Sequence, residues 1–373
     1  MEESKRNEDT MIENNGTDVT GSQNLLGLEY EDISRVIAQL PGIKSYSARQ
    51  LYSWIYSKHA QSFDVMTNMP LPLRKALSIG YRISKPLLER VSTSTDETRK
   101  YLFRLEDGEL IESVWIPEES RNTMCLSTQV GCRMGCIFCA TAQLGFKRNL
   151  TSGEIVGQSL HILDEIGYRD RRVNVVFMGM GEGLDNYEQL MRAFRLLADP
   201  SGLAISPRRI TLSTVGLVPG IERLALEPRA PKLAVSLNSP FDDERSRIMP
   251  VNKKYSIAQL LKAVSGFMAT RHDGEKIRFN ERVTFEYALL KGVNDTPAHA
   301  HELIRLLRNV PAKLNLLAFN PTPTLPYERP DDQWIESFKE ILLGADVPVS
   351  FRKSRGRDIE AACGQLAAQQ SNK

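Results

Sequence analysis

The sequence predicts an α/β fold: an incomplete parallel barrel of the (β/α)6 type, preceded by a small helical domain and a β-hairpin extension. From residue 123 onward, short β-rich runs alternate with amphipathic helical stretches, which is typical of parallel sheets with right-handed crossovers. Six or seven strands can be placed there, fewer than the eight of a closed barrel. Residues 25–92 show only helical periodicity. A doubly wound open sheet is the competing architecture.

Length and composition indicate a globular protein of about two domains. The 373 residues are 41% hydrophobic and 25% charged. We see no secretory signal and no run near the roughly 18 apolar residues that cross a bilayer, so we expect a cytoplasmic protein without membrane contact. Seven acids and two bases give residues 1–30 a charge of −5. Since the net charge of the chain is +2, the remaining residues carry +7. That charge permits an anionic partner.

The segments before the barrel differ in periodicity. Residues 1–24 are polar and are predicted to form a disordered tail. Within 25–92, apolar spacing of three to four predicts helices near 33–40 and 48–56 and a third that begins near Leu73. Residues 93–122 are predicted to be a β-hairpin linker, because strands near 100–105 and 109–116 flank Asp107-Gly108, a strong turn signal.

The barrel is predicted at 123–352, followed by a C-terminal segment at 353–373. Its strands are expected near 123–129, 173–179, 209–214, 232–237, 282–290, 313–319 and 347–352. Its helices are expected near 152–166, 186–198, 256–269, 297–308 and 331–343.

The cysteines carry the strongest chemical signal. Cys132, Cys136 and Cys139 form a C-x3-C-x2-C cluster, and an odd total of five argues against structural disulfides. Zinc and [4Fe–4S] sites normally take four protein ligands, and the next candidate, His161, lies in a predicted helix. Three ligands leave an open coordination position, which indicates chemistry. The alternative is a structural zinc knuckle with a distant fourth ligand.

This cluster, with Phe138 before its last cysteine, resembles the signature of radical S-adenosylmethionine (SAM) enzymes. Over about residues 26–368 the chain resembles the RlmN/Cfr family of radical SAM adenine methyltransferases, which act on large-subunit ribosomal RNA. The segments that carry this resemblance are 125–132, 177–182, 212–216, 236–238, 292–295, 319–321 and 361–366. It implies a [4Fe–4S] cluster on Cys132, Cys136 and Cys139 and two SAM molecules per turnover.

The resemblance also implies a SAM site. Its residues follow predicted strands, at the end of the barrel where active sites are built. Asn238 and Gly183 depart from the family, in which many members carry His and Pro at these positions. The residues implied to line the site are Gly181, Glu182, Ser213, Ser236, Leu237, Asn238 and Asn320.

Three further residues receive roles from the family scheme. Cys363 takes a methyl group from one SAM as a thiolate. A radical from a second SAM removes a hydrogen from this S-methyl group, and the methylene radical adds to the adenine. Glu112, in the family's E-x-V motif and beside apolar neighbours that could bury it, removes the ring proton. Cys125 then attacks Cys363, which forms a transient disulfide and releases the methylated base. The structural alternatives are two buried apolar cysteines and an exposed strand glutamate.

The implied substrate is adenine 2503 of 23S rRNA, before or during ribosome assembly, with tRNA as a second candidate and an electron donor such as flavodoxin. The basic clusters at 147–148, 208–209 and 351–357 could contact phosphates or could be solvated faces. The basic segment before Cys363 and the N-terminal extension favour C2 methylation over the Cfr-type C8 reaction. A non-catalytic RNA-binding protein with a metal knuckle is the rival from another class.

Overall fold

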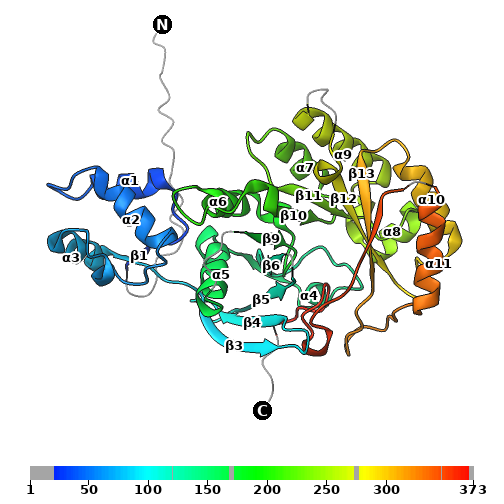
Figure 1. Ribbon diagram of the computed structural model, residues 1–373, viewed down its shortest axis with the longest axis horizontal. Coiled ribbons are helices and arrows are strands. Elements are labelled where there is room, and N and C mark those ends of the chain that lie inside the picture. The colour runs from blue at the N-terminus through cyan, green and yellow to red at the C-terminus, as the bar shows by residue number, and fades with distance from the viewer. Residues whose placement is uncertain (1–20, 120, 168–171, 273–276, 346, 369–373) are drawn as a thin grey trace, which may run out of the picture.

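The computed structural model describes residues 21–119, 121–167, 172–272, 277–345 and 347–368. The predicted disordered tail lies almost entirely outside this range. The centre of the molecule is an open ten-stranded sheet in the order β14-β13-β12-β11-β10-β9-β6-β5-β4-β3 (Figure 1).

Seven neighbouring strands of this sheet are parallel and form the incomplete barrel that the sequence predicts. They are β6 Asn122–Cys125, β9 Val173–Phe177, β10 Ile210–Thr214, β11 Lys232–Ser236, β12 Val283–Leu289, β13 Ala312–Ala318 and β14 Val349–Arg352. The helices between them are α5 Ser152–Glu165, α6 Tyr187–Ala198, α7 Val218–Ala225, α8 Asp242–Ile248, α9 Ile257–His272, α10 Pro297–Leu307 and α11 Asp332–Leu343. The short α7 and α8 were not predicted.

Three antiparallel strands extend the barrel: β5 Leu110–Pro117, β4 Arg99–Arg104 and β3 Leu87–Thr93. The predicted hairpin is confirmed, since the Leu105 N–H donates to the Glu109 carbonyl across the Asp107-Gly108 turn at 2.8 Å. The helical expectation is wrong at 87–92, where most of β3 lies. Pro86 cannot continue a helix, and the residues after it pair with the edge of β4 that lies opposite β5.

The first barrel strand is shorter than predicted. It ends at Cys125, and residues Gln129–Gly131 form a separate strand, β7, antiparallel to β8 at Phe146–Asn149. This ribbon closes the loop that carries the three clustered cysteines. Gly131 is required there, because its φ is +71° and a Cβ would lie 1.8 Å from the Gly145 carbonyl oxygen. The short helix α4, Ala140–Gln143, follows the loop.

The N-terminal helices pack against the barrel. They are α1 Tyr30–Ala38, α2 Tyr46–Tyr56 and α3 Leu71–Gly80, flanked by the two-residue strands β1 Gln23–Asn24 and β2 Tyr81–Arg82. The Tyr52 hydroxyl donates to Asp199 at 2.7 Å, and Arg195 pairs with Glu29 at 2.5 Å. One apolar core runs from these helices into the barrel.

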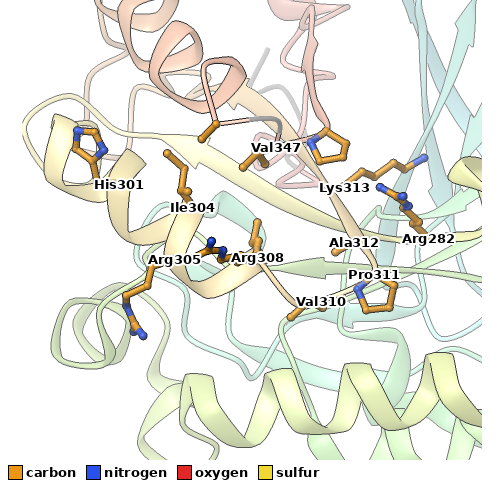
Figure 2. A pocket seen from close by; sticks show the side chains of 13 residues that line it. Arg282, His301, Ile304, Arg305, Arg308, Val310, Pro311, Ala312, Lys313 and Val347 are labelled. Carbon is orange, nitrogen blue, oxygen red and sulfur yellow. The ribbon is translucent and has the colours of Figure 1, made fainter.

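One cavity lies at the amino-terminal end of the barrel strands, between α10 and β13 (Figure 2). It measures about 670 Å³, and its polar lining is basic, with Arg282, Arg308 and Lys313 among the residues. The predicted site residues lie elsewhere, at or beyond the opposite ends of the strands. In the part of the chain described, no helix is long and apolar enough to cross a membrane.

Candidate active site

The cysteine loop gathers three thiols between β7 and α4. Cys132 and Cys136 are buried, Cys139 is half-buried, and all three are free. Burial raises the pKa of the Cys132 thiol to about 12 and raises the pKa of Cys136 and Cys139, and charge on one thiol raises the pKa of its neighbours. Metal coordination removes such protons. Within the described residues, no three His, Cys, Asp or Glu side chains are grouped for a single ion. An all-sulfur donor set on one loop fits a [4Fe–4S] cluster, which takes each thiolate on a different iron.

Glu182 lies beside this loop. It is 3% exposed, and its carboxylate accepts hydrogen bonds from the Leu184 N–H at 3.1 Å and the Val215 N–H at 2.8 Å. Burial is the main reason that its pKa rises to about 7. Glycine at position 181 lets the backbone before Glu182 pass close to Gln129, because its φ is +101° and a Cβ would lie 2.6 Å from the Cβ of Gln129.

Ser213 and Ser236 lie at the carboxyl ends of β10 and β11, and buried Leu237 and Asn238 follow at once. Asn238 has a φ of +55°, which asparagine tolerates better than most residues. Its side-chain oxygen accepts from the Ala288 N–H at 2.8 Å. The Asn238 side chain therefore shapes this turn. Gly183 is the second position at which the sequence departs from many members of the family. A Cβ on Gly183 would lie 2.6 Å from a terminal carbon of Leu212.

Arg245 on α8 is a residue that sequence reasoning missed. It is fully buried, and it donates to the carbonyls of Leu237 at 2.9 Å, Ser236 at 3.0 Å and Val215 at 2.7 Å. Its fourth partner is the side-chain oxygen of Asn252, which accepts a hydrogen bond at 2.8 Å. Burial lowers its pKa to about 10. Arg245 therefore fixes the backbone at the ends of β10 and β11. Most residues of α8 are charged, so the sequence alone predicts that Arg245 is exposed to solvent.

A smaller cavity of about 110 Å³, here called the thiol cavity, lies at the carboxyl ends of the strands. Cys125 from the end of β6, Cys139 from the cysteine loop and Cys363 from the C-terminal segment all line it. Asn320 lines it too, and its side-chain amide donates to the Cys363 carbonyl at 3.2 Å. The structure thus brings residues far apart in sequence to one place. Cys125 and Cys363 are both free.

The C-terminal segment is anchored on both sides of Cys363 and lies beside α4 (Figure 1). After it, the Ala140 N–H donates to the Gly364 carbonyl at 2.8 Å, and the Thr141 hydroxyl donates to Leu366 at 2.6 Å. Before it, the turn between β3 and β4 contributes Asp96, which accepts from the Gly356 N–H at 3.0 Å. The turn that follows β3 therefore helps to position the segment that carries Cys363.

Glu112 on β5 is 2% exposed, so the predicted burial is present. One carboxylate oxygen lies 3.1 Å from the Lys100 ammonium. The other accepts from the N–H groups of Ala367 at 3.0 Å and Ala368 at 3.1 Å. Glu112 thus contacts the C-terminal segment a few residues beyond Cys363, and it does not line the thiol cavity.

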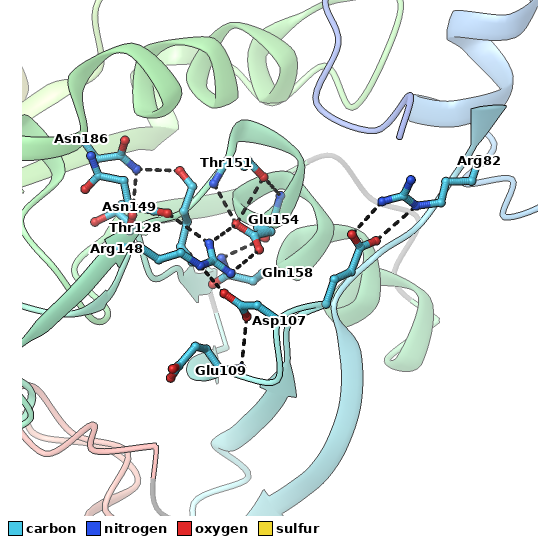
Figure 3. A network of polar contacts seen from close by, with 12 residues as sticks. Arg82, Asp107, Glu109, Thr128, Arg148, Asn149, Thr151, Glu154, Gln158 and Asn186 are labelled. Carbon is cyan, nitrogen blue, oxygen red and sulfur yellow. Dashed lines mark hydrogen bonds and ion pairs between the residues drawn. The ribbon is translucent and has the colours of Figure 1, made fainter. Parts of the chain in front are cut away.

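Two of the predicted RNA-contacting cations are paired within the protein. Arg148 lies between Asp107 at 2.5 Å and Glu154 at 2.8 Å (Figure 3). Lys147 pairs with Glu109 at 2.6 Å. These carboxylates compensate both charges, so the 147–148 cluster offers little charge to a phosphate.

His161, the next ligand candidate on the sequence, does not join the cysteines. It lies on α5 against the Phe103 ring, with ring centroids 5.4 Å apart, and burial lowers its pKa to about 4.

The lowered pKa of His161 predicts a pH-dependent stability. Because the pKa of His161 in the folded chain is below its value in the unfolded chain, the unfolded chain binds the proton first, and stability is lost as pH falls from about 6.5 to about 4. We expect His161→Phe to lose less stability than wild type over this window, measured by urea midpoints. His301→Gln, at an exposed position, is the control and should follow wild type. Equal losses in all three proteins would contradict this assignment.

Comparison with known proteins shows the family of the chain. The model of the radical SAM superfamily matches residues 126–307, and that of the ribosomal RNA large subunit methyltransferase N-terminal domain matches residues 23–83. The dual-specificity RNA methyltransferase RlmN of Nitratidesulfovibrio vulgaris is 44% identical over 92% of this chain and 94% of its own. That of Desulfosudis oleivorans is 46% identical over 87% and 86%. The crystal structure of a radical SAM methyltransferase from Sphaerobacter thermophilus has a TM-score of 0.87 and 42% identity, covering 93% of this chain and all of that one. The chain therefore belongs to the RlmN family of the radical SAM superfamily.

Proposed function

We propose that this protein methylates adenine at C2, at position 2503 of 23S rRNA and at position 37 of tRNA, through an S-methyl group on Cys363. As a member of its superfamily, it is an enzyme that uses a [4Fe–4S] cluster and SAM. The observation that carries the proposal is the thiol cavity, in which Cys363 and Cys125 share one space with the cluster cysteine Cys139. The dual-specificity name of the relatives supports two RNA substrates.

The proposed steps use the chain's own residues. The cluster on Cys132, Cys136 and Cys139, with SAM beside it, supplies a methyl group and a carbon-centred radical when bound. The exposed Cys363 sulfur accepts the methyl group and then carries it to the adenine. Burial raises the pKa of the Cys125 thiol to about 12, so Cys125 must lose its proton in order to attack Cys363.

The SAM site proposed from Gly181, Glu182, Ser213, Ser236, Leu237, Asn238 and Asn320 is supported by their position. These residues lie at or beyond the carboxyl ends of β9, β10, β11 and β13. Parallel barrels place binding groups at this end of their strands.

We further propose that residues 25–92 form an accessory RNA-binding domain, 93–122 a linker, 123–352 the catalytic barrel and 353–373 the segment that delivers the methyl carrier. Methylation in the cytoplasm before or during ribosome assembly fits a target base that must be exposed to react. A small electron-transfer protein such as flavodoxin would supply the electron.

Nucleoside analysis tests the proposal. The anaerobically reconstituted protein is incubated with SAM, a reductant and unmodified 23S rRNA or tRNA, and the digested RNA is compared with authentic methyladenosines. We expect 2-methyladenosine in both RNAs. 8-Methyladenosine would replace the proposal by the Cfr-type reaction, and absence of any methyladenosine would refute it.

Glu112→Gln tests the proposed base. The amide keeps the size of the side chain and still accepts hydrogen bonds from Ala367 and Ala368, but it cannot take the ring proton. We expect product formation to fall by about 100-fold or more while a covalent enzyme–RNA adduct accumulates. Gel electrophoresis under denaturing conditions measures the adduct.

The control is Glu89→Gln, at an exposed position on β3 and outside the thiol cavity; it should neither lose turnover nor trap adduct. Unimpaired turnover by Glu112→Gln would remove Glu112 from the reaction.

A further inference from the structure

Arg352, the last residue of β14, points to the sulfur of Cys363. Its Nη1 atom lies 3.9 Å from the Cys363 Sγ atom. Arg352 also lines the thiol cavity, together with Cys125. Arg352 thus comes from the last parallel strand, and its guanidinium lies near two thiols: Cys125 at the end of the first parallel strand and Cys363 in the C-terminal segment.

Among the residues that the structure describes, no carboxylate forms an ion pair with Arg352 within 4 Å, and acids act on Arg352 only through longer-range electrostatic interaction. The carboxylates with the largest electrostatic influence on Arg352 are those of Glu286 and Glu118. Glu286 also accepts a hydrogen bond from the Asn315 side chain at 2.7 Å. Charge on Cys363 is the largest influence that raises the pKa of Arg352, ahead of these two acids and Cys125. A half-buried guanidinium in this position favours an anion beside it.

We propose that Arg352 is a catalytic residue: it holds the positive charge that stabilises the anionic sulfur of Cys363 for methyl acceptance and of Cys125 for the later attack. This inference rests on the proposed function. In the first step, the Cys363 thiol gives its proton to solvent. A sulfur electron pair then forms the S–CH₃ bond, while the bond from the methyl group to the donor sulfonium breaks and leaves its pair on that sulfur.

The methylated Cys363 sulfur is neutral, so Arg352 loses its first anionic partner. Cys125 lies in the same cavity, and Arg352 acts on its thiol in the direction that favours the thiolate, against the effect of burial. One cation can therefore serve the two sulfurs in turn. The adduct first loses its ring proton to the base and its unpaired electron to a one-electron acceptor. When Cys125 then attacks as a thiolate, an S–S bond forms, and the Cys363–carbon bond breaks with its pair leaving on the methylated base, which takes a proton.

Alkylation of Cys363 tests the role without RNA. The cluster-loaded full chain, kept anaerobic and without added SAM, is treated with iodoacetamide at pH 7, and the unmethylated Cys363 peptide is followed by mass spectrometry. We expect Arg352→Met to slow its alkylation by about tenfold or more and Arg352→Lys to restore most of the rate, because the ammonium keeps the charge. Lys353→Met removes an exposed cation from the next residue and should alkylate as wild type does.

Iron content and the urea midpoint of each variant establish that it is folded and loaded. Wild-type alkylation in folded Arg352→Met would overturn the proposal, as would equal slowing by Lys353→Met or failure of Arg352→Lys to rescue. If wild type forms no methyladenosine but Arg352→Met still slows alkylation, the proposed function fails while the electrostatic role stands. If wild type forms 2-methyladenosine and Arg352→Met alkylates normally, only the role of Arg352 fails.

Discussion

Cys363→Ala is expected to lose methyl transfer to RNA by on the order of a thousandfold or more, because adenine C2 is electron-poor and the account offers no other methyl carrier. Mass spectrometry of the C-terminal peptide reports the carrier directly. Wild type incubated with SAM should gain about 14 Da on this peptide, as expected for S-methylation of a thiolate. The variant should gain nothing.

The matched control for this experiment is Cys125→Ala, which should still gain the methyl group on Cys363. Both variants keep the cysteine loop intact, so both should hold the same iron content. Methylated RNA from folded, iron-loaded Cys363→Ala would contradict the account, since methyl transfer would then bypass the C-terminal segment.

Cys125→Ala is expected to stop the reaction one step later, with RNA covalently attached to Cys363. Cys125 and Cys363 line one cavity, so removal of the Cys125 sulfur leaves the adduct without its resolving nucleophile. Denaturing gels with labelled RNA should show a protein–RNA band that grows with time, while released product falls by about 100-fold or more.

The double variant with both cysteines replaced should form no band, which ties the attachment to Cys363. Release of methylated RNA by Cys125→Ala at the wild-type rate would show that another group resolves the adduct.

Much of the barrel was predictable, because buried parallel strands and amphipathic helices leave repeating patterns in the sequence. The cysteine loop was predictable from its spacing and its glycines. Strand β3 was not, because its pairing with β4 is a tertiary contact that overrides a weak local pattern. Tertiary contact also hid Arg245, because its partners include carbonyls just beyond the ends of β10 and β11.

The position of Cys363 was inferred only through family resemblance. In the structure, its location follows from contacts across more than 200 residues of sequence, such as that of Thr141 with Leu366. The contact of Glu112 with Ala367 and Ala368 is of the same kind. Such contacts leave no periodic signal, so local pattern could suggest a buried glutamate but not its partners.

The central claim is that Cys363 carries the methyl carbon and loses one of its hydrogens before the carbon reaches adenine. Deuterium counting tests it most directly. The enzyme is cycled with SAM bearing a trideuterated methyl group in ordinary water, and the 2-methyladenosine formed after the first turnover is analysed by mass spectrometry. The account predicts a methyl group with two deuteriums and one hydrogen taken from solvent. A methyl group that retains all three deuteriums would mean direct transfer and would contradict it.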